Sequence, residues 1–369
     1  MLILAAIALA LWLAVLALPW RPWSCREYLE ADAAERSDTD ALTVLIPARD
    51  EAALIGETLR AIADTAPDAA IVLIDDQSSD GTVEAARRCG LPNLTIVHGT
   101  PPPEGWAGKL WALQQGLART NTPQVLLLDA DIRLAPGLLA ALQRKADTGY
   151  ALASVCAEPC WQGWAARWLL PAFVYFFKLL YPFALANRAD SRVAAAAGGV
   201  ILVERAALTA AGGFSAWRDA IIDDCTLAAH VKRAGQRCWI GLSHGARSLR
   251  HEDIGDIARM VARSAFVQLR ESWWLVVAAT ALLVLAFWIP VLAVVIGTPA
   301  AKTLGALAWL ALAGCYLPTL LFYRRNPLAA IALPLAATFF LVMTWYSAAR
   351  ALTGTRSVWK DRRYPRGAH

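Results

Sequence analysis

Three short acidic motifs are the parts of this 369-residue chain best suited to chemistry. The first, Asp75 to Thr82 (DDQSSDGT), closes an apolar run and leads through Ser and Gly into a helical pattern. Carboxylates beside the free N–H groups of a helix start can hold a nucleoside through its base and ribose hydroxyls. Asp, Ser and Gly are also preferred in ordinary capped turns. The motif alone leaves both interpretations open.

The second motif is Asp129-Ala130-Asp131, directly after the apolar run 125–128. In an extended chain, residues two apart point the same way, so both carboxylates can face one site. Two hard oxygen ligands suit Mg²⁺ or Mn²⁺, which keeps several waters and binds substrate phosphates as well. Such a metal would neutralise a departing diphosphate. A D-x-D sequence is common by chance, and its place at the end of a buried strand is what favours the metal site.

The third motif, Asp223-Asp224, opens a helical pattern that runs to Ala234. Acids at a helix start are stabilised by the helix dipole, so simple capping is the alternative. Sugar transfer requires a second acidic pair, because one carboxylate must remove the proton from the acceptor hydroxyl as it attacks the anomeric carbon. The transition state should resemble an oxocarbenium ion, with diphosphate leaving on the opposite face.

Two basic residues could complete such a site. Lys109 opens a helical pattern after a loop rich in Gly and Pro, a position that suits phosphate contact. Arg263, near the end of the polar part of the chain, could hold a diphosphate through two parallel hydrogen bonds. A solvated surface charge is the alternative for each of them.

The elements around these motifs predict an α/β fold. Four short apolar runs read as buried strands of a parallel sheet, and helical patterns lie between them. The predicted strands are 42–47, 71–75, 94–97 and 125–128, and the predicted helices are 51–65, 82–89 and 109–120. Strand and helix in alternation are typical of doubly wound sheets, whose ligands bind at the carboxyl ends of the strands.

The remainder of the chain is strongly apolar. Hydrophobic residues make up 57% of it and the mean hydropathy is +0.43, while a net charge of +5 gives no support for nucleic-acid binding. Residues 1–20 carry no charge and predict a retained membrane anchor rather than a cleaved signal peptide. Stretches near 273–296, 303–323 and 328–349 are each long enough to span a membrane.

Charges near these stretches predict sidedness but leave a conflict. Arg21 and Arg26 follow the first stretch and place the polar part of the chain in the cytoplasm. One span before it and three after it would put the basic tail, Arg356 to Arg366, outside, against the positive-inside tendency. Either one stretch is re-entrant or the tail breaks the rule. The segment 161–187, broken by two prolines and a lysine, predicts a shallow interfacial helix pair, with a buried core helix as the alternative.

Taken in order, the motifs resemble the family 2 inverting glycosyltransferases of GT-A fold, over about residues 40–270. The likeness includes Val44 to Glu51 (VLIPARDE), the DDQSSDGT run, Gly108-Lys109, Asp129-Ala130-Asp131, Gly212-Gly213-Phe214 and Asp223-Asp224. The whole chain looks like the hopene-associated membrane glycosyltransferases, through residues 105–111, 171–177, 181–183, 194–199, 221–229, 260–270 and 359–364.

This resemblance implies a role for each matching residue. Pro47, Arg49, Glu51 and Asp76 would line the nucleoside pocket, with Lys109 near the uridine or the diphosphate. Asp129 and Asp131 would hold the donor and the metal, and Asp224 would be the general base with Asp223 beside it. Many membrane-bound relatives carry Q-x-x-R-W. Here residues 260–264 keep only Arg263, which disfavours a processive polymerase and favours a single transfer to lipid.

The implied protein is a metal-dependent enzyme of the bacterial inner membrane, multi-pass, with its catalytic domain facing the cytoplasm. It would move a sugar from a nucleotide sugar, with UDP as the expected nucleotide, to a hopanoid or related polyprenoid lipid. Polyprenyl phosphate or diacylglycerol as acceptor, or a non-catalytic nucleotide-binding scaffold, are the alternatives. The predicted domains are an anchor (1–20), a linker (21–39), a GT-A domain containing the interfacial segment (40–271), three spans (272–352) and a basic tail (353–369).

Overall fold

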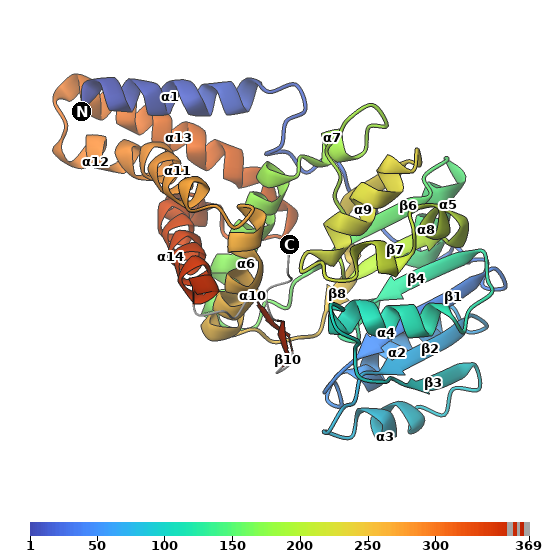
Figure 1. Cartoon of the computed structure of the whole chain (residues 1–369). Coiled ribbons are helices and arrows are strands. Elements are labelled where there is room, and N and C mark those ends of the chain that lie inside the picture. Colours follow the sequence, from blue (N-terminus) through green and yellow to red (C-terminus); the bar gives the residue numbers. More distant parts are fainter. Residues whose placement is uncertain (353–356, 360–361, 365–369) are drawn as a thin grey trace. The chain divides into compact units, whose positions relative to one another are not determined.

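The computed structural model describes residues 1–352, 357–359 and 362–364, and the chain divides into two compact units (Figure 1). The first, which we call the sheet unit, contains Glu27–Cys160, Leu185–Arg250 and the described residues from Val358 on. The second, the helical unit, contains Met1–Arg26, Trp161–Ala184 and His251–Ser357.

The sheet unit is built on one eight-stranded sheet with the order β3-β2-β1-β4-β7-β6-β8-β5. Its strands are β1 Leu42–Ala48, β2 Ala70–Asp75, β3 Leu94–His98, β4 Gln124–Leu128, β5 Ile132–Leu134, β6 Leu152–Glu158, β7 Val200–Glu204 and β8 Cys238–Ser248. The helices of this unit are α2 Ile55–Thr65, α3 Thr82–Arg87, α4 Gly108–Leu117, α5 Leu138–Asp147, α8 Arg205–Ala210, the 3₁₀ turn η1 Phe214–Trp217 and α9 Asp223–Arg233. Two further short strands, β9 Ser357–Trp359 and β10 Arg362–Tyr364, pair with each other.

The first four strands are parallel, as their apolar runs predict. Every residue of β1 is buried, because the two faces of the sheet are both covered. Val44 and Ile46 of β1 pack on the face that α2 covers, while Leu45 between them packs on the face that α4 covers. Strand alternation therefore divides one apolar run between two cores.

The second half of the sheet differs from the predicted parallel arrangement. Strand β7 is antiparallel to both β4 and β6, and β5 is antiparallel to β8, so the sheet is mixed. Because β7 runs against β4, the residues before β7 lie at the same edge as the residues after β4. The carboxyl ends of β1, β2 and β4 meet at that edge, where β1 has β2 on one side and β4 on the other. This reversal of strand order is where doubly wound sheets bind ligands.

The helical unit contains the apolar segments. Its helices are α1 Leu2–Ala17, α6 Trp164–Leu180, α7 Phe183–Ala186 (which begins in this unit), α10 Ile254–Gln268, α11 Trp273–Leu283, the π turn η2 Val284–Trp288, α12 Ile289–Ile296, α13 Pro299–Phe322, the 3₁₀ turn η3 Pro327–Ala332 and α14 Leu333–Leu352. Trp273–Ile296, Pro299–Phe322 and Pro327–Leu352 are long and apolar enough to cross a membrane, as predicted.

Two other apolar segments are predicted, an N-terminal anchor and an interfacial helix pair. Helix α1 has 16 residues, fewer than the roughly 20 that a span requires, so the N-terminal anchor stays a prediction. The segment predicted as a helix pair forms α6 and α7, with Pro171 inside α6 and Lys178 buried on it. Its interfacial position and the predicted domain boundaries also stay predictions.

Candidate active site

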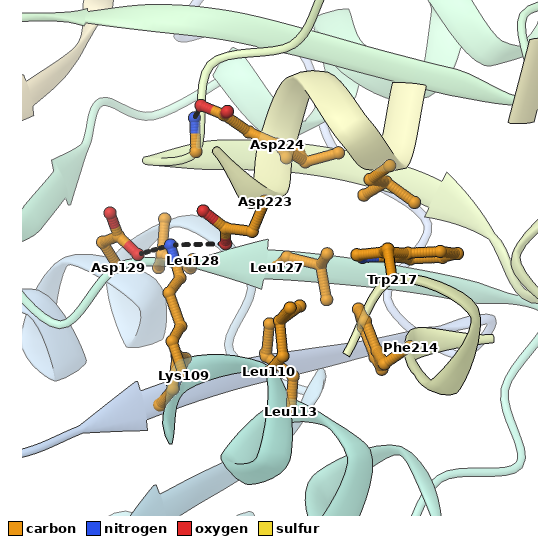
Figure 2. A pocket seen from close by; sticks show the side chains of 14 residues that line it. Lys109, Leu110, Leu113, Leu127, Leu128, Asp129, Phe214, Trp217, Asp223 and Asp224 are labelled. Atoms are coloured by element: carbon orange, nitrogen blue, oxygen red, sulfur yellow. Dashed lines mark hydrogen bonds and ion pairs between the residues drawn. The ribbon is translucent and has the colours of Figure 1, made fainter. Parts of the chain in front are cut away.

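The acidic pair Asp223 and Asp224 forms the first turn of α9, as its sequence predicts. It faces a pocket whose other walls come from the carboxyl edge of the sheet and from α4 (Figure 2). The pocket encloses about 330 Å³ of empty space, part of it open to solvent. Its lining consists of Pro47, Lys109, Leu110, Leu113, Leu127, Leu128, Asp129, Gly198, Ile201, Phe214, Trp217, Asp223, Asp224 and Leu227.

Lys109 connects the two acidic motifs. Its Nζ lies 2.8 Å from Asp129 Oδ1 and 3.5 Å from Asp223 Oδ2, and Figure 2 shows the side chain reaching from α4 to both carboxylates. Burial by itself lowers the pKa of Lys109, but the charges of Asp129 and Asp223 outweigh it and raise that pKa above its usual value. Lys109 is therefore a fixed cation between two acids that are far apart in sequence.

Asp224 is held separately from this ion pair. Its Oδ2 accepts the backbone N–H of Gly198 at 2.8 Å, and its Oδ1 accepts the N–H of Cys225 at 2.7 Å. Burial, and then the neighbouring charge of Asp223, raise the pKa of Asp224 to about 6. A carboxylate with a pKa near neutrality, oriented by two backbone donors at a pocket wall, has the properties of a general base.

Gly198 brings the backbone close to this carboxylate. A Cβ added to it would lie 3.2 Å from Asp224 Oδ2 and 3.4 Å from Lys109 Nζ. Any larger residue would have to displace one of these two side chains by a few tenths of an ångström. The absence of a side chain at Gly198 thus has a local reason in the geometry of the pocket.

The Asp129-Ala130-Asp131 motif adopts a turn rather than the predicted extended conformation, because β4 ends at Leu128 and Ile132 N donates to Asp129 O. The two carboxylates consequently take different partners. Asp129 meets Lys109, whereas Asp131 Oδ2 accepts from Arg250 Nε at 3.1 Å and from Ser248 Oγ at 3.2 Å. Burial, and to a lesser extent the nearby charge of Asp131, raise the pKa of Asp129 against the opposing effect of Lys109.

Arg250, just after β8, is a site residue that the sequence motifs did not indicate. Besides Asp131, its guanidinium contacts the buried Glu51 carboxylate, with Nη2 2.5 Å from Oε1. One cation thus joins an acid of the predicted nucleoside pocket to an acid of the predicted metal pair. Glu51 and Arg250 are far apart in sequence, and no local pattern marks the contact.

The predicted nucleoside corner lies where β1 and β2 end. Arg49 Nη1 donates to the backbone oxygen of Asp76 at 2.6 Å, and Asp76 N donates to Ala48 O at 2.8 Å. The Asp76 side chain is fully buried. Asp80, two residues before the first residue of α3, accepts from Thr82 N at 3.0 Å, so part of the motif forms a local turn.

The donor set fits a hard divalent cation, although no group of three His, Cys, Asp or Glu side chains in the described residues is arranged around a metal position. In the described part of the chain, Asp129 Oδ2 and Asp131 Oδ1 accept no hydrogen bond, which leaves one oxygen of each carboxylate for a ligand. A cation that retains waters and shares phosphate oxygens needs no more than these two protein ligands.

The predicted site residues other than Arg263 thus divide into three groups. Pro47, Lys109, Asp129, Asp223 and Asp224 line the pocket, Glu51 and Asp131 meet through Arg250, and Arg49 meets Asp76. Arg263 lies instead on α10 of the helical unit, where its buried Nε has no hydrogen-bond partner among the described residues. Its predicted contact with a diphosphate stays a prediction.

Part of the sequence is similar to a known protein family and to a curated protein. Residues 43–210 match the family model described as Glycosyl transferase family 2. The 4,4'-diaponeurosporenoate glycosyltransferase of Staphylococcus aureus (strain USA300) is 34% identical over 92 residues, which cover 25% of this chain and 24% of that protein. The match therefore spans about a quarter of the length of this curated relative.

A solved structure resembles the fold over most of the chain. Mannosyltransferase PcManGT from Pyrobaculum calidifontis, in complex with GDP-Man and Mn²⁺, has a TM-score of 0.57 and 22% sequence identity, covering 92% of this chain and 98% of that chain. The fold is accordingly of GT-A type, a mixed sheet flanked by helices. Over residues 43–210 the chain is thus similar to the family 2 glycosyltransferases.

Proposed function

We propose that the protein is a membrane-bound inverting glycosyltransferase that moves a sugar from a nucleotide sugar, UDP being the expected nucleotide, to a hopanoid or related polyprenoid lipid. The observation that carries the catalytic part is the position of Asp224. A carboxylate whose pKa is raised to about 6 shares one pocket with a cationic lysine and with Asp129 at the carboxyl edge of a GT-A sheet.

In the proposed reaction, Asp224 removes the proton from the acceptor hydroxyl. The hydroxyl oxygen forms the new bond to the anomeric carbon, and the bond from that carbon to the diphosphate oxygen breaks on the opposite face. Lys109 lies where it can hold negative charge that develops on the leaving diphosphate. The proton ends on the Asp224 carboxylate and the electron pair on the nucleoside diphosphate.

Asp129 and Asp131 are the residues that would hold Mg²⁺ or Mn²⁺. When bound, such a cation would stabilise the charge of the departing diphosphate. The donor complex of the similar mannosyltransferase contains Mn²⁺ together with its nucleotide sugar, which supports the same pairing here.

A lipid acceptor is supported by two observations. Three helices are long and apolar enough to cross a membrane, which suits an enzyme whose acceptor is dissolved in one. The curated relative is named as a glycosyltransferase of 4,4'-diaponeurosporenoate, which is also a long apolar molecule. The choice of a hopanoid over other lipids rests on the sequence resemblance.

The test is transfer of radiolabelled sugar to lipid by the purified full chain in detergent. Donors would include UDP- and GDP-sugars, and acceptors would include a hopanoid, a polyprenyl phosphate, diacylglycerol and a carotenoid acid. Wild type would be compared with Asp224→Asn, Asp129→Asn and the control Asp64→Asn, whose side chain is exposed on α2. Each reaction would be run with Mg²⁺, Mn²⁺ or EDTA.

We expect metal-dependent labelling of the hopanoid by wild type and by Asp64→Asn, and none by the other two variants. Labelling of another lipid alone would replace the acceptor. Nucleotide binding without any transfer would favour the scaffold alternative, and the absence of nucleotide binding would overturn the proposed function.

A further inference from the structure

The apolar segment Pro327–Leu352 is long enough to cross a membrane, yet its contacts within the helical unit do not follow a crossing path. From the contacts below we propose that it is re-entrant, so that the chain leaves the bilayer at the face where it entered. This inference concerns membrane topology and does not depend on the proposed function.

The directions of the other apolar helices define the two faces of the helical unit. Trp273–Ile296 ends at Gly297, and α13 returns beside it. A Cβ on Gly305 of α13 would lie 2.7 Å from both Ala293 Cβ and the Pro290 oxygen of α12. Two helices packed this closely and joined by a two-residue turn are antiparallel. Helix α13 therefore ends at the face where α11 begins.

Helix α1 has the same direction as α13, and in Figure 1 the two lie side by side. Near its middle, Trp12 Nε1 donates to Ala286 O at 2.7 Å. Beyond its end, Ser24 O accepts from the buried Lys178 Nζ, which also donates to Thr319 Oγ1 near the end of α13. Helix α1 thus also ends at the face where α11 begins.

That face collects positive charge, and we call it the arginine face. It is defined by residues beside the helix ends: Arg21 and Arg26 after α1, Arg270 before α11, and Arg324 and Arg325 after α13. The opposite face is marked by the turn at Gly297 and Thr298. The positive-inside tendency makes the arginine face cytoplasmic.

The segment that follows α13 first goes inward. Ile331 O of η3 accepts from Trp309 Nε1 at 3.1 Å, and Trp309 lies 13 residues before the end of α13, about 20 Å of helix rise. Thr338 Oγ1 accepts from Trp288 Nε1 at 2.8 Å, and Trp288 lies 15 residues into its helix, about 22 Å of rise. The start of α14 is therefore deep in the bundle.

From there α14 runs back along α11. Trp345 Nε1 donates to Thr280 Oγ1 at 3.0 Å, and Ala348 and Ala351 pack with Val276, one turn from the start of α11. Higher residue numbers on α14 thus meet lower ones on α11, which is the order expected if α14 returns. The 14 residues from Thr338 to Leu352 rise about 21 Å, which matches the depth of Trp288.

The end of α14 is fixed at that face by α10. Ser347 Oγ donates to Ala262 O at 2.5 Å and accepts from Phe266 N at 3.2 Å. Helix α10 is followed by Arg270 and then by the first residue of α11, Trp273, so its end lies at the arginine face.

A re-entrant segment must satisfy its backbone inside the bilayer, where each unpaired polar group is costly. The 3₁₀ turn η3 continues directly into α14, and the indole of Trp309 takes the carbonyl of Ile331. Thr338 Oγ1 donates to Pro334 O at 2.9 Å, close to the proline that lacks an N–H. Protein side chains thus cover the backbone where the path turns.

The inference removes the charge conflict that hydropathy alone creates. If Leu352 lies at the arginine face, the basic residues of the following sequence, from Arg356 to Arg366, are on the side that the positive-inside tendency requires. A third crossing would place them on the other side.

Single added cysteines in the full chain test the sidedness. Ser272→Cys marks the start of α11, Thr298→Cys marks the turn at the opposite face, and Leu352→Cys marks the exposed last residue of α14. A membrane-impermeant maleimide would be applied to spheroplasts and to inverted vesicles. The unmodified chain, whose seven cysteines are free and mostly buried, gives the background.

We expect Leu352→Cys to be labelled from the same side as Ser272→Cys, and Thr298→Cys from the opposite side. Labelling of Leu352→Cys together with Thr298→Cys would overturn the inference. A second readout avoids the added cysteines: alkaline phosphatase fused to the end of the full chain should be inactive and a fluorescent protein fused there should fluoresce. An active phosphatase at that end would overturn the inference as well.

Discussion

The ammonium of Lys109 lies 2.8 Å from the carboxylate of Asp129, although the two residues stand on different elements of the sheet unit. The same ammonium lies 3.5 Å from Asp223, so one cation joins the acid after β4 to the acid pair of α9. The arrangement couples the proposed donor side of the pocket to its proposed base.

Replacing Lys109 with Met should lower the turnover number by roughly a hundredfold, because a preorganised cation next to the leaving group is lost. It should also raise the pKa of Asp224 above about 6, since the charge of Lys109 lowers that pKa. The acidic limb of the pH–rate profile would then move to higher pH. Lys109→Arg should keep the limb near its wild-type position, and Arg119→Met, exposed just after α4, is the control. An unmoved limb in Lys109→Met would contradict the coupling.

Asp224 sets the direction of the pH dependence. A general base works only when deprotonated, so activity should rise with pH through about 6 and level off above it. Asp224→Asn should lose roughly 10²- to 10⁴-fold in turnover while nucleotide binding changes little. Steady-state rates from pH 5 to 8, with donor binding measured by calorimetry, check both statements. A profile without a limb in this range would remove Asp224 from the role of base.

Much of this site could be predicted from the sequence because its parts are local. The runs before Pro47, Asp75 and Asp129 are short and almost entirely apolar, and a sheet that is covered on both faces requires such strands. The acid pair precedes a regular helical pattern, so the start of α9 at Asp223 also follows from local residues. Because these motifs follow the ends of parallel strands, they are expected to meet at one edge of the sheet.

The remainder depends on contacts that have no local pattern. The sequence predicted Lys109 beside phosphate but not its ion pairs with both acidic motifs, which the packing of α4 and α9 on one edge creates. Arg250 reaches Glu51 across the fold, and nothing near either residue indicates the pair. Hydropathy likewise cannot distinguish a crossing helix from a re-entrant one, because both are long and apolar.

Arg250 and a divalent cation should compete for the Asp131 carboxylate. The guanidinium Nε is 3.1 Å from Asp131 Oδ2, so removing it with Arg250→Gln leaves this acid open to the metal. We expect Mn²⁺ to bind the nucleotide-free variant more tightly than wild type, because the second oxygen of Asp131 becomes available to the metal. Electron paramagnetic resonance of free Mn²⁺ measures this directly.

The control for that experiment is Arg133→Gln, an exposed arginine that pairs with Glu57 on the surface. It should leave Mn²⁺ affinity at the wild-type value. If Arg250→Gln instead weakens Mn²⁺ binding, Arg250 orients Asp131 for the metal rather than competing with it. The sign of the change therefore decides between the two roles.

Gly198 should act as a positioning residue for Asp224. Its N–H holds Asp224 Oδ2 at 2.8 Å, and an alanine Cβ would lie 3.2 Å from that oxygen and 3.4 Å from Lys109 Nζ. The carboxylate or the ammonium must then shift by a few tenths of an ångström. Misplacement of a reacting group is costly, so we expect Gly198→Ala to lower the turnover number by roughly 10- to 100-fold. The donor KM and the melting temperature should change little, because the nucleoside corner and the core are untouched.

Gly56→Ala, whose Cβ would have only ordinary contacts at 3.6 Å or more, is the control and should keep full activity. Wild-type turnover in Gly198→Ala would show that the position of Asp224 tolerates the shift. A raised donor KM with unchanged turnover would show that Gly198 acts on donor binding instead of on proton removal.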